Sequence, residues 1–247
     1  MTGTSRIQVP KRFRVIAHRG ASGYAPENTI AAFRLAADMG VREIEFDVRL
    51  SRDGKLVVAH DPSFDRLGIP GAVVADMTLA ELRELDLGQW FGDGRFAGER
   101  IVTVEEIFRT FGDRFIYHAE IKVPSSRLAE LLIAEIDRFA FRTRTIVTSF
   151  DFDVLAEIRE LAPEQRVGWL VRDRGLSETN IDCAAAMGFF QFCPRANETE
   201  SALVAAAKQR IAEVRAHGIK EKSDLRRAVA AGCDGATLNW PDWAVAA

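Results

Sequence analysis

The sequence predicts an α/β fold made of a parallel sheet and its crossover helices. Short apolar runs alternate with longer amphipathic runs along most of the 247 residues. Apolar side chains in the longer runs recur at the spacing of one helical face, and Gly40 and Gly232 follow two of these runs as helix stops. Strands that alternate with helices favour a parallel sheet. The pattern fits a closed eight-stranded barrel and also a doubly wound open sheet.

The expected elements follow one another in a regular order from residue 14 onward. Strands are expected at Arg14–His18, Glu43–Val48, Phe115–Lys122, Arg144–Phe150, Arg166–Val171, Phe189–Pro194, Val214–Ile219 and Gly235–Asn239. Helices are expected at Asn28–Met39, Val104–Phe111, Arg127–Phe139, Phe152–Leu161, Ile181–Met187, Ser201–Arg210 and Ser223–Ala231, with Asn28 or Thr29 as the first N-cap.

One long stretch, at about residues 51–102, interrupts this order after the second strand. It begins with a turn at Ser51–Gly54 and a short strand at Lys55–His60, and it continues with a helix at Leu79–Leu85 and a glycine-rich segment. Long loops of this kind often carry function. We expect a small insertion on the C-terminal face of one domain that spans residues 1–247.

The two ends of the chain are expected to differ from the regular pattern. The first dozen residues are expected to be a loose arm. Only a few residues follow Trp240–Trp243, so the eighth helix is expected to be short or absent. Its absence would leave an apolar surface on which a second copy of the chain could bind, making a homo-oligomer.

Composition excludes several classes of function. The net charge of −3 and the pI of about 5.9 argue against binding to nucleic acid or to anionic membranes. No apolar run is long enough for a membrane span, and no signal peptide is visible. Three widely spaced cysteines form neither a disulfide framework nor a zinc pattern and are expected to be buried. We therefore expect a cytoplasmic protein without stable membrane association.

Carboxylates are paired on one strand. Glu45 and Asp47 lie two residues apart, so their side chains point to the same face. Buried like charges are costly unless a cation or a proton intervenes. The pair therefore indicates a metal site, although a solvated face of an edge strand would show the same pattern.

A second polar face occurs at the third expected strand. His118, Glu120 and Lys122 alternate along it, and a polar inner face on a barrel strand indicates a site. Together with Glu45 and Asp47, Glu120 would complete a set of three carboxylates, which suits Mg²⁺ or Ca²⁺ better than zinc. Lys122 could neutralise a bound phosphate, or it could form an ordinary exposed pair with Glu120.

All four histidines of the chain lie at or near expected strand ends, where catalytic groups of a barrel gather. His18 closes the first strand and His60 closes the short strand of the insertion. An imidazole can act as general base and an imidazolium as general acid. Arg19, next to His18, offers a guanidinium fork suited to phosphate oxygens.

The order and spacing of these residues resemble the signature of glycerophosphodiester phosphodiesterases. The matching segments are His18–Gly20, Pro26–Thr29, Glu45–Val48, Asp53-Gly54, His60-Asp61, Gly98–Thr103, Glu120–Lys122, Ser149-Phe150 and Asp234–Thr237. The resemblance covers residues from about 14 to 243, and the combined N-terminal motif is highly specific.

The resemblance implies a (β/α)8 TIM barrel with an insertion after the second strand. It places Glu45, Asp47 and Glu120 on the metal ligands of the family. It places His18 and His60 on the acid–base pair, and Arg19 and Lys122 on the phosphate contacts. The implied reaction is metal-dependent hydrolysis of a glycerophosphodiester to glycerol 3-phosphate and an alcohol.

Two histidines depart from the family pattern. His217 opens a His-Gly-Ile-Lys segment where the family usually has Trp-Thr-Val-Asn, and His118 replaces a smaller polar residue. We expect His118 to lie one layer beneath the metal and to orient a ligating carboxylate. We expect His217 at the mouth of the site, where it would favour a small polar alcohol over a lipid chain. The alternatives are a space-filling His118 and a solvated His217.

Other functions also fit a barrel with this motif. One is lysophospholipase-D-like cleavage of lipid phosphodiesters, for which Trp90, Phe91 and Phe96 could form an apolar rim. A related barrel family cleaves phosphodiesters by internal attack and forms a cyclic phosphate. A third function is ligand binding by an inactive barrel, which the intact carboxylates and histidines argue against.

Overall fold

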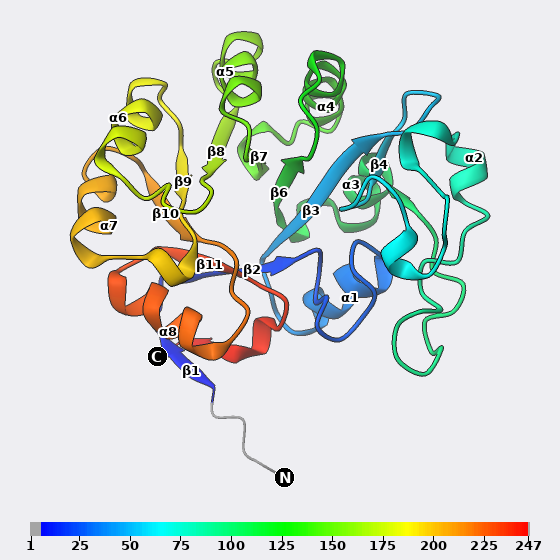
Figure 1. Cartoon of the computed structure of the whole chain (residues 1–247), viewed down its shortest axis with the longest axis horizontal. Coiled ribbons are helices and arrows are strands. Elements are labelled where there is room, and N and C mark those ends of the chain that lie inside the picture. Colours follow the sequence, from blue (N-terminus) through cyan, green and yellow to red (C-terminus); the bar gives the residue numbers. More distant parts are fainter. Residues whose placement is uncertain (1–5, 247) are drawn as a thin grey trace.

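The computed structural model describes residues 6–246 and shows eight parallel strands closed into a barrel (Figure 1). The strands are β2 (Arg14–His18), β3 (Glu43–Leu50), β6 (Ile116–Ile121), β7 (Thr145–Ser149), β8 (Arg166–Leu170), β9 (Gln191–Cys193), β10 (Glu213–Ala216) and β11 (Gly235–Leu238). They are hydrogen-bonded in the order β2-β11-β10-β9-β8-β7-β6-β3, and β2 also pairs with β3. This last pairing closes the ring, confirms the expected barrel and excludes the open sheet.

Helices form the outer layer of the barrel and lie between successive strands (Figure 1). They are α1 (Ile30–Asp38), α3 (Val104–Phe111), α4 (Ser126–Arg138), α5 (Phe152–Leu161), α6 (Glu178–Ala186), α7 (Ser201–Lys208) and α8 (Lys222–Ala231). Side chains cap several N-termini. The N-cap of α1 is Thr29, whose hydroxyl accepts from the backbone of Ala32, and Thr103 and Glu106 form a capping box at α3.

The alternation of side chains along β3 separates the apolar layer from the site. Phe46 packs edge-on against Phe33 of α1 and Phe108 of α3, in the layer between strands and helices. Neighbouring residues of a strand point to opposite faces. Glu45 and Asp47 therefore point into the barrel, where they lie buried.

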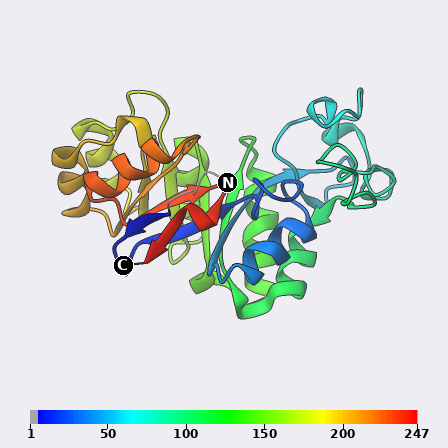
Figure 2. The same cartoon turned by 90° about the horizontal axis from the view of Figure 1, so that it is seen from below.

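The insertion extends the sheet beyond β3 (Figure 2). It has its own small apolar core. It contains β4 (Leu56–Val58), β5 (Val102–Thr103), the 3-10 turns η1 (Asp65–Leu67) and η2 (Val74–Asp76), and the short helix α2 (Leu79–Leu82). β4 pairs antiparallel with the C-terminal end of β3. The insertion therefore starts at the end of the barrel where the strands carry their polar residues.

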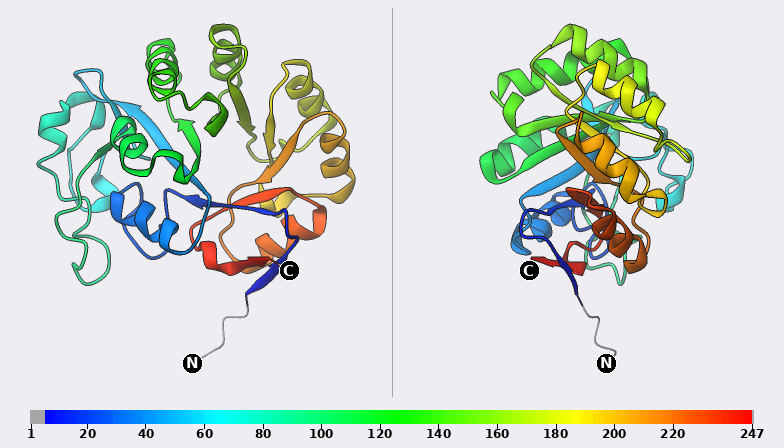
Figure 3. Two further views of the ribbon diagram at one scale, coloured as in Figure 1. Left: turned by 180° about the vertical axis from the view of Figure 1, so that it is seen from behind. Right: turned by 90° about the vertical axis from the view of Figure 1, so that its left-hand side faces the viewer.

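The N-terminal segment is ordered as a strand, so the expected loose arm is wrong for residues 7–9. β1 (Ile7–Val9) pairs in parallel with β12 (Ala244–Ala246), which brings the two ends of the described chain together (Figure 3). The reason is the alternation at Ile7 and Val9, whose side chains are buried while Gln8 is exposed. Residues 1–5 of the expected arm lie outside the described residues.

The segment after β11, the eighth barrel strand, forms a 3-10 turn in place of an α-helix, as expected. The 3-10 turn η6 (Pro241–Trp243) follows β11, and the rings of Trp240 and Trp243 stack with centroids 4.5 Å apart.

Among residues 6–246, no helix is both long enough and apolar enough to cross a bilayer. Two of the cysteines are buried as expected, but Cys183 is exposed because it lies on the solvent side of α6.

Candidate active site

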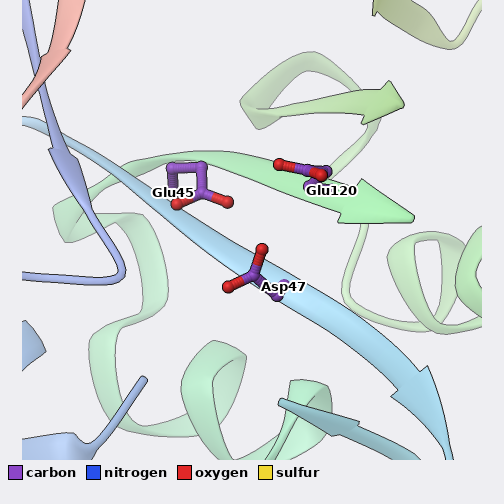
Figure 4. A group of neighbouring side chains, drawn as sticks. All are labelled: Glu45, Asp47 and Glu120. Atoms are coloured by element: carbon purple, nitrogen blue, oxygen red, sulfur yellow. The ribbon is translucent and has the colours of Figure 1, made fainter. Parts of the chain in front are cut away.

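Three carboxylates converge on the neighbouring strands β3 and β6. Glu45 and Asp47 lie two residues apart on β3, and the strand register places Glu120 of β6 directly opposite Asp47. One carboxylate oxygen from each residue lies within 4.8 Å of the others. Figure 4 shows the three carboxylate groups turned toward one another. All three residues are buried, so the sequence-predicted group is a compact acidic cluster inside the barrel.

The carboxylate cluster has the properties of a divalent cation site. Burial and the charge of Asp47 hold the pKa of Glu45 well above its usual range and also raise the pKa of Glu120. Glu45 Oε1 and Asp47 Oδ1 are buried and accept no hydrogen bond. A cluster of three carboxylates, two of which keep an oxygen without a hydrogen bond, supplies the ligands that Mg²⁺ or Ca²⁺ prefers, and the residues therefore fit such an ion.

Two cations border the cluster. Arg19 Nε lies 3.0 Å from Asp47 Oδ2, and Lys122 Nζ lies 2.6 Å from Glu120 Oε1 and 3.4 Å from Asp47 Oδ1. Burial alone would raise the pKa of Asp47, but these two positive charges outweigh it and hold that pKa below its usual range. Arg19 has a φ of 55°, a left-handed conformation that places its backbone N–H 3.0 Å from Glu45 Oε2.

His18 and His60 line the same cavity from two different elements. His18 closes β2, and its Nδ1 lies 2.6 Å from Asn239 Oδ1. His60 follows β4 of the insertion, and its Nδ1 lies 2.7 Å from Asp61 Oδ1. An oxygen partner fixes a proton on Nδ1, so Nε2 of each neutral ring is left for proton exchange. Burial lowers the pKa of His18 to about 3 and also lowers the pKa of His60.

A chain of ion pairs links the insertion to the barrel. Arg66 of the insertion binds Asp61, the partner of His60, with Nε 2.6 Å from Oδ2. Arg66 also contacts Glu27, and Glu27 in turn lies 3.1 Å from Arg19 Nη1. The second histidine is therefore tied to the arginine that borders the carboxylate cluster.

These groups line one cavity of about 340 Å³ at the C-terminal end of the barrel strands. Its lining includes His18, Arg19, Glu45, His60, Glu120, Lys122, Phe150, Leu170, Arg215, His217, Gly218, Ile219, Lys220, Thr237 and Asn239. The proposed proton carriers His18 and His60, four cationic side chains and two of the three carboxylates thus meet in a volume that suits a small ligand.

Comparison with known proteins identifies the family. The model of the glycerophosphoryl diester phosphodiesterase family matches residues 18–243. The chain belongs to this family. It is 38% identical over 232 residues to a glycerophosphodiester phosphodiesterase of Caldanaerobacter subterraneus subsp. tengcongensis, and the match covers 92% of this chain and 94% of that protein. The resemblance seen in the motifs is thereby confirmed, and the protein is a phosphoric diester hydrolase.

Solved structures of the same family share the barrel. A glycerophosphodiester phosphodiesterase from Agrobacterium tumefaciens superposes with a TM-score of 0.80 at 26% identity, covering 94% of this chain and 98% of that one. A phosphodiesterase from Oleispira antarctica, solved in complex with the product sn-glycerol-3-phosphate, gives a TM-score of 0.84 at 26% identity and covers 95% and 94% of the two chains.

His118 of this phosphodiesterase does not contact the carboxylate cluster, so the expected bond to a ligating carboxylate is wrong. Its Nε2 lies 2.9 Å from Oε2 of Glu43, the residue two positions before Glu45 on β3. The register sets His118 opposite Glu45, but the ring reaches down the barrel, where Arg14 binds the other oxygen of Glu43 at 2.6 Å. Burial lowers the pKa of His118 to about 4, so the ring is neutral.

His217 is buried in the cavity wall, so the alternative of a solvated loop residue is wrong. Its Nε2 donates to the backbone oxygen of Val171 at 3.0 Å, and its ring meets Phe150 edge-on at 5.3 Å. Burial lowers the pKa of His217 to about 4, and the ring is therefore neutral as well.

Several residues of the site were not predicted from the sequence. Asn28 was expected as a helix cap and as part of the Pro26–Thr29 motif, with no role at the carboxylates, yet its Nδ2 donates to Asp47 Oδ2 at 2.8 Å from a left-handed backbone with φ of 59°. Asn239 orients His18, and Arg215 lines the cavity from β10. The two-residue spacing of Arg215 and His217 was the available signal, since it sets both on the inner face of one strand.

Proposed function

We propose that the protein hydrolyses glycerophosphodiesters to glycerol 3-phosphate and an alcohol with a divalent cation, Mg²⁺ or Ca²⁺, on Glu45, Asp47 and Glu120. The observation that carries the proposal is the convergence of these carboxylates beside a cavity that both His18 and His60 line. The related Oleispira antarctica phosphodiesterase, solved with sn-glycerol-3-phosphate, supports the same product for this chain.

The cations at the border of the cluster would hold the phosphate. A bound divalent ion supplies Lewis acidity and countercharge for a phosphoryl oxygen. Lys122 contributes a point charge, and Arg19 contributes a planar fork that matches two phosphate oxygens. Their pairing with Asp47 and Glu120 keeps both side chains in place before the substrate arrives.

We assign the base to His18 and the acid to His60. Asn239, a neutral amide, orients His18, so Nε2 stays unprotonated and can take a proton from the attacking hydroxyl of water or of the substrate. Asp61, a carboxylate, orients His60 and favours its imidazolium, which can protonate the leaving oxygen. Each role is worth about 10²–10⁴-fold in rate.

A small alcohol is favoured over a lipid chain. Trp90, Phe91 and Phe96, which could form an apolar rim, pack edge-on against one another in the insertion. Within the described part of the chain, none of the three is among the residues that line the cavity. Lysophospholipase-D-like cleavage is therefore the weaker alternative, and an inactive binding barrel is opposed by the complete set of carboxylates and histidines.

We further propose that residues 1–247 act as one barrel domain with its insertion at 51–102. We propose the cytoplasm as its compartment because the three cysteines are free thiols, which a reducing environment maintains.

The test is an assay of the purified protein with a panel of glycerophosphodiesters and lysophospholipids. Each substrate is offered after chelation and after return of Mg²⁺, Ca²⁺ or Mn²⁺, and phosphorus NMR identifies the products. We expect glycerol 3-phosphate only in the metal-restored samples. Turnover that persists unchanged in chelator would refute the metal requirement, and a cyclic phosphate product would point to internal attack.

A further inference from the structure

Arg215 is a buried cation in the cavity wall that lacks a carboxylate partner. Only 2% of its surface is exposed, and it lines the cavity from β10. Its Nη1 donates to Thr237 Oγ1 at 2.6 Å and its Nη2 to the Sγ of Cys193 at 3.5 Å, while the buried Nε has no partner. A guanidinium offers five N–H donors, so these contacts leave several unused. Within residues 6–246 we find no ion pair for Arg215.

The acidic residues of the barrel interior are bound by other cations. Arg14 pairs with Glu43 at 2.6 Å and also with Glu213 of β10. Glu120 is bound by Lys122 at 2.6 Å. A buried charge without a countercharge is strongly unfavourable, and a bound anion would supply that countercharge to Arg215.

The position of Arg215 in the ring separates it from the carboxylate cluster. β10 lies four strands from β6 in the closed ring of eight, so Arg215 faces Glu120 across the barrel. One side of the cavity is formed by β8, β9, β10 and the loops that follow them. The described residues that line this side include Arg215 and Lys220 but no carboxylate. The cavity therefore has a metal-binding wall and, across from it, a cationic wall.

We propose that Arg215 binds an anionic group on the substrate's alcohol and thereby selects glycerophosphodiesters whose alcohol carries a carboxylate or a phosphate. The inference rests on the proposed function, in which Arg19, Lys122 and a divalent cation on the carboxylate cluster hold the phosphodiester. A second anionic group on the same small molecule would extend across the cavity to the guanidinium. Buried donors that are left without an acceptor are energetically costly. The site therefore discriminates against a substrate analogue that lacks the anionic group.

Two substrates that differ by one carboxylate test this proposal. Glycerophosphoserine and glycerophosphoethanolamine share the glycerol phosphate and the amine, and only the first carries a carboxylate. We expect kcat/KM for the serine ester to exceed that for the ethanolamine ester by at least about tenfold. Arg215→Gln should bring the ratio to within about twofold of one, because the charged donor is lost. Arg215→Lys keeps a charge without the fork and should give an intermediate ratio.

Arg172→Gln is the matched control. Arg172 is exposed, lies over the ring of Phe150 and does not line the cavity, so this variant removes the same charge from the rim and should keep the wild-type ratio. A wild-type ratio near one, or a ratio that Arg215→Gln leaves unchanged, would overturn the proposal. Because each ratio compares two substrates on one variant, a general loss of folded protein does not alter it.

A binding measurement separates this inference from the proposed function. O-phosphoserine and O-phosphoethanolamine also differ by one carboxylate. Calorimetry measures the binding of each compound without any turnover. Tighter binding of phosphoserine that disappears in Arg215→Gln would support the role of Arg215 even if no glycerophosphodiester is cleaved. Equal binding of the two compounds to the wild-type protein would refute it, whatever the enzyme hydrolyses.

Discussion

Arg66 of the insertion donates from Nη2 to Oε1 of Glu27, on the loop after β2, at 2.5 Å. The same guanidinium holds Asp61, the partner of His60, so a single side chain joins the second histidine to the barrel. An exposed ion pair contributes little to stability. The value of this contact therefore lies in the position that it gives to His60.

Arg66→Met should lower kcat by about tenfold with little change in the free energy of unfolding, because proton transfer depends strongly on the placement of the acid. Steady-state kinetics and urea unfolding measure the two quantities. Arg52→Met is the control, since Arg52 forms an exposed pair with Glu81 inside the insertion at 2.9 Å. Equal losses of kcat in the two variants would contradict the positioning role of Arg66.

Metal affinity should weaken as the pH falls. The folded-state pKa values of Glu45 and Glu120 are raised, so these carboxyls hold protons in the metal-free protein that a cation must displace. Calorimetry in buffers of different ionisation enthalpy should detect proton release on binding, and Glu120→Gln should reduce both the release and the affinity. Affinity that stays constant from about pH 5 to pH 8, without proton release, would contradict the assignment of the ligands.

The same raised pKa values predict how metal-free stability depends on pH. A carboxyl whose pKa is higher in the folded state contributes stability at low pH, and this stability is lost as the pH rises through the folded-state pKa. Saturating metal should reverse the loss, adding about 2.7 kcal/mol at a hundredfold excess over Kd. Thermal unfolding with and without chelator measures both effects.

Asp61→Asn should shift the alkaline limb of the kcat/KM profile to lower pH. The hydrogen bond from His60 to Asp61 raises the pKa of the imidazole against the effect of burial. Without the carboxylate the imidazolium loses its proton at lower pH, so the population of protonated His60 also falls at lower pH. Asp93→Asn, a change in an exposed Asp–Arg pair of the insertion, should leave the profile in place. An unmoved alkaline limb in Asp61→Asn would remove His60 from the role of acid.

His118 should make the protein acid-sensitive through its buried, neutral ring. Its pKa falls from 6.5 in the unfolded chain to about 4 in the fold, so its contribution to stability is complete above pH 6.5 and is lost as the pH falls toward 4. The loss amounts to about 3 kcal/mol for this ring alone. Urea unfolding from pH 7 to pH 4 should show a shallower decline in His118→Gln than in wild type, and parallel curves would contradict this account.

The sequence was sufficient to predict the positions of residues that depend only on the two-residue period of a strand. Glu45 and Asp47 lie on the same face of β3 whichever strands pair with it. The family motif then predicted that Glu120 belongs to the same site. The partner of His118 could not be predicted, because it depends on the register of β3 against β6 and on the reach of the imidazole to Glu43. The ordered N-terminal segment was missed because its pairing partner lies at the other end of the chain.

The hydrogen bond between His18 and Asn239 joins residues 221 positions apart, across the pairing of β2 with β11, the final barrel strand in the sequence. A chain emerging from the ribosome meets this partner only when β11 has been synthesised and has docked beside β2. The proposed base is consequently oriented at the end of folding, since contacts between distant positions form slowly. A nascent or partly folded chain would carry the carboxylate cluster on β3 and β6 before it could perform catalysis.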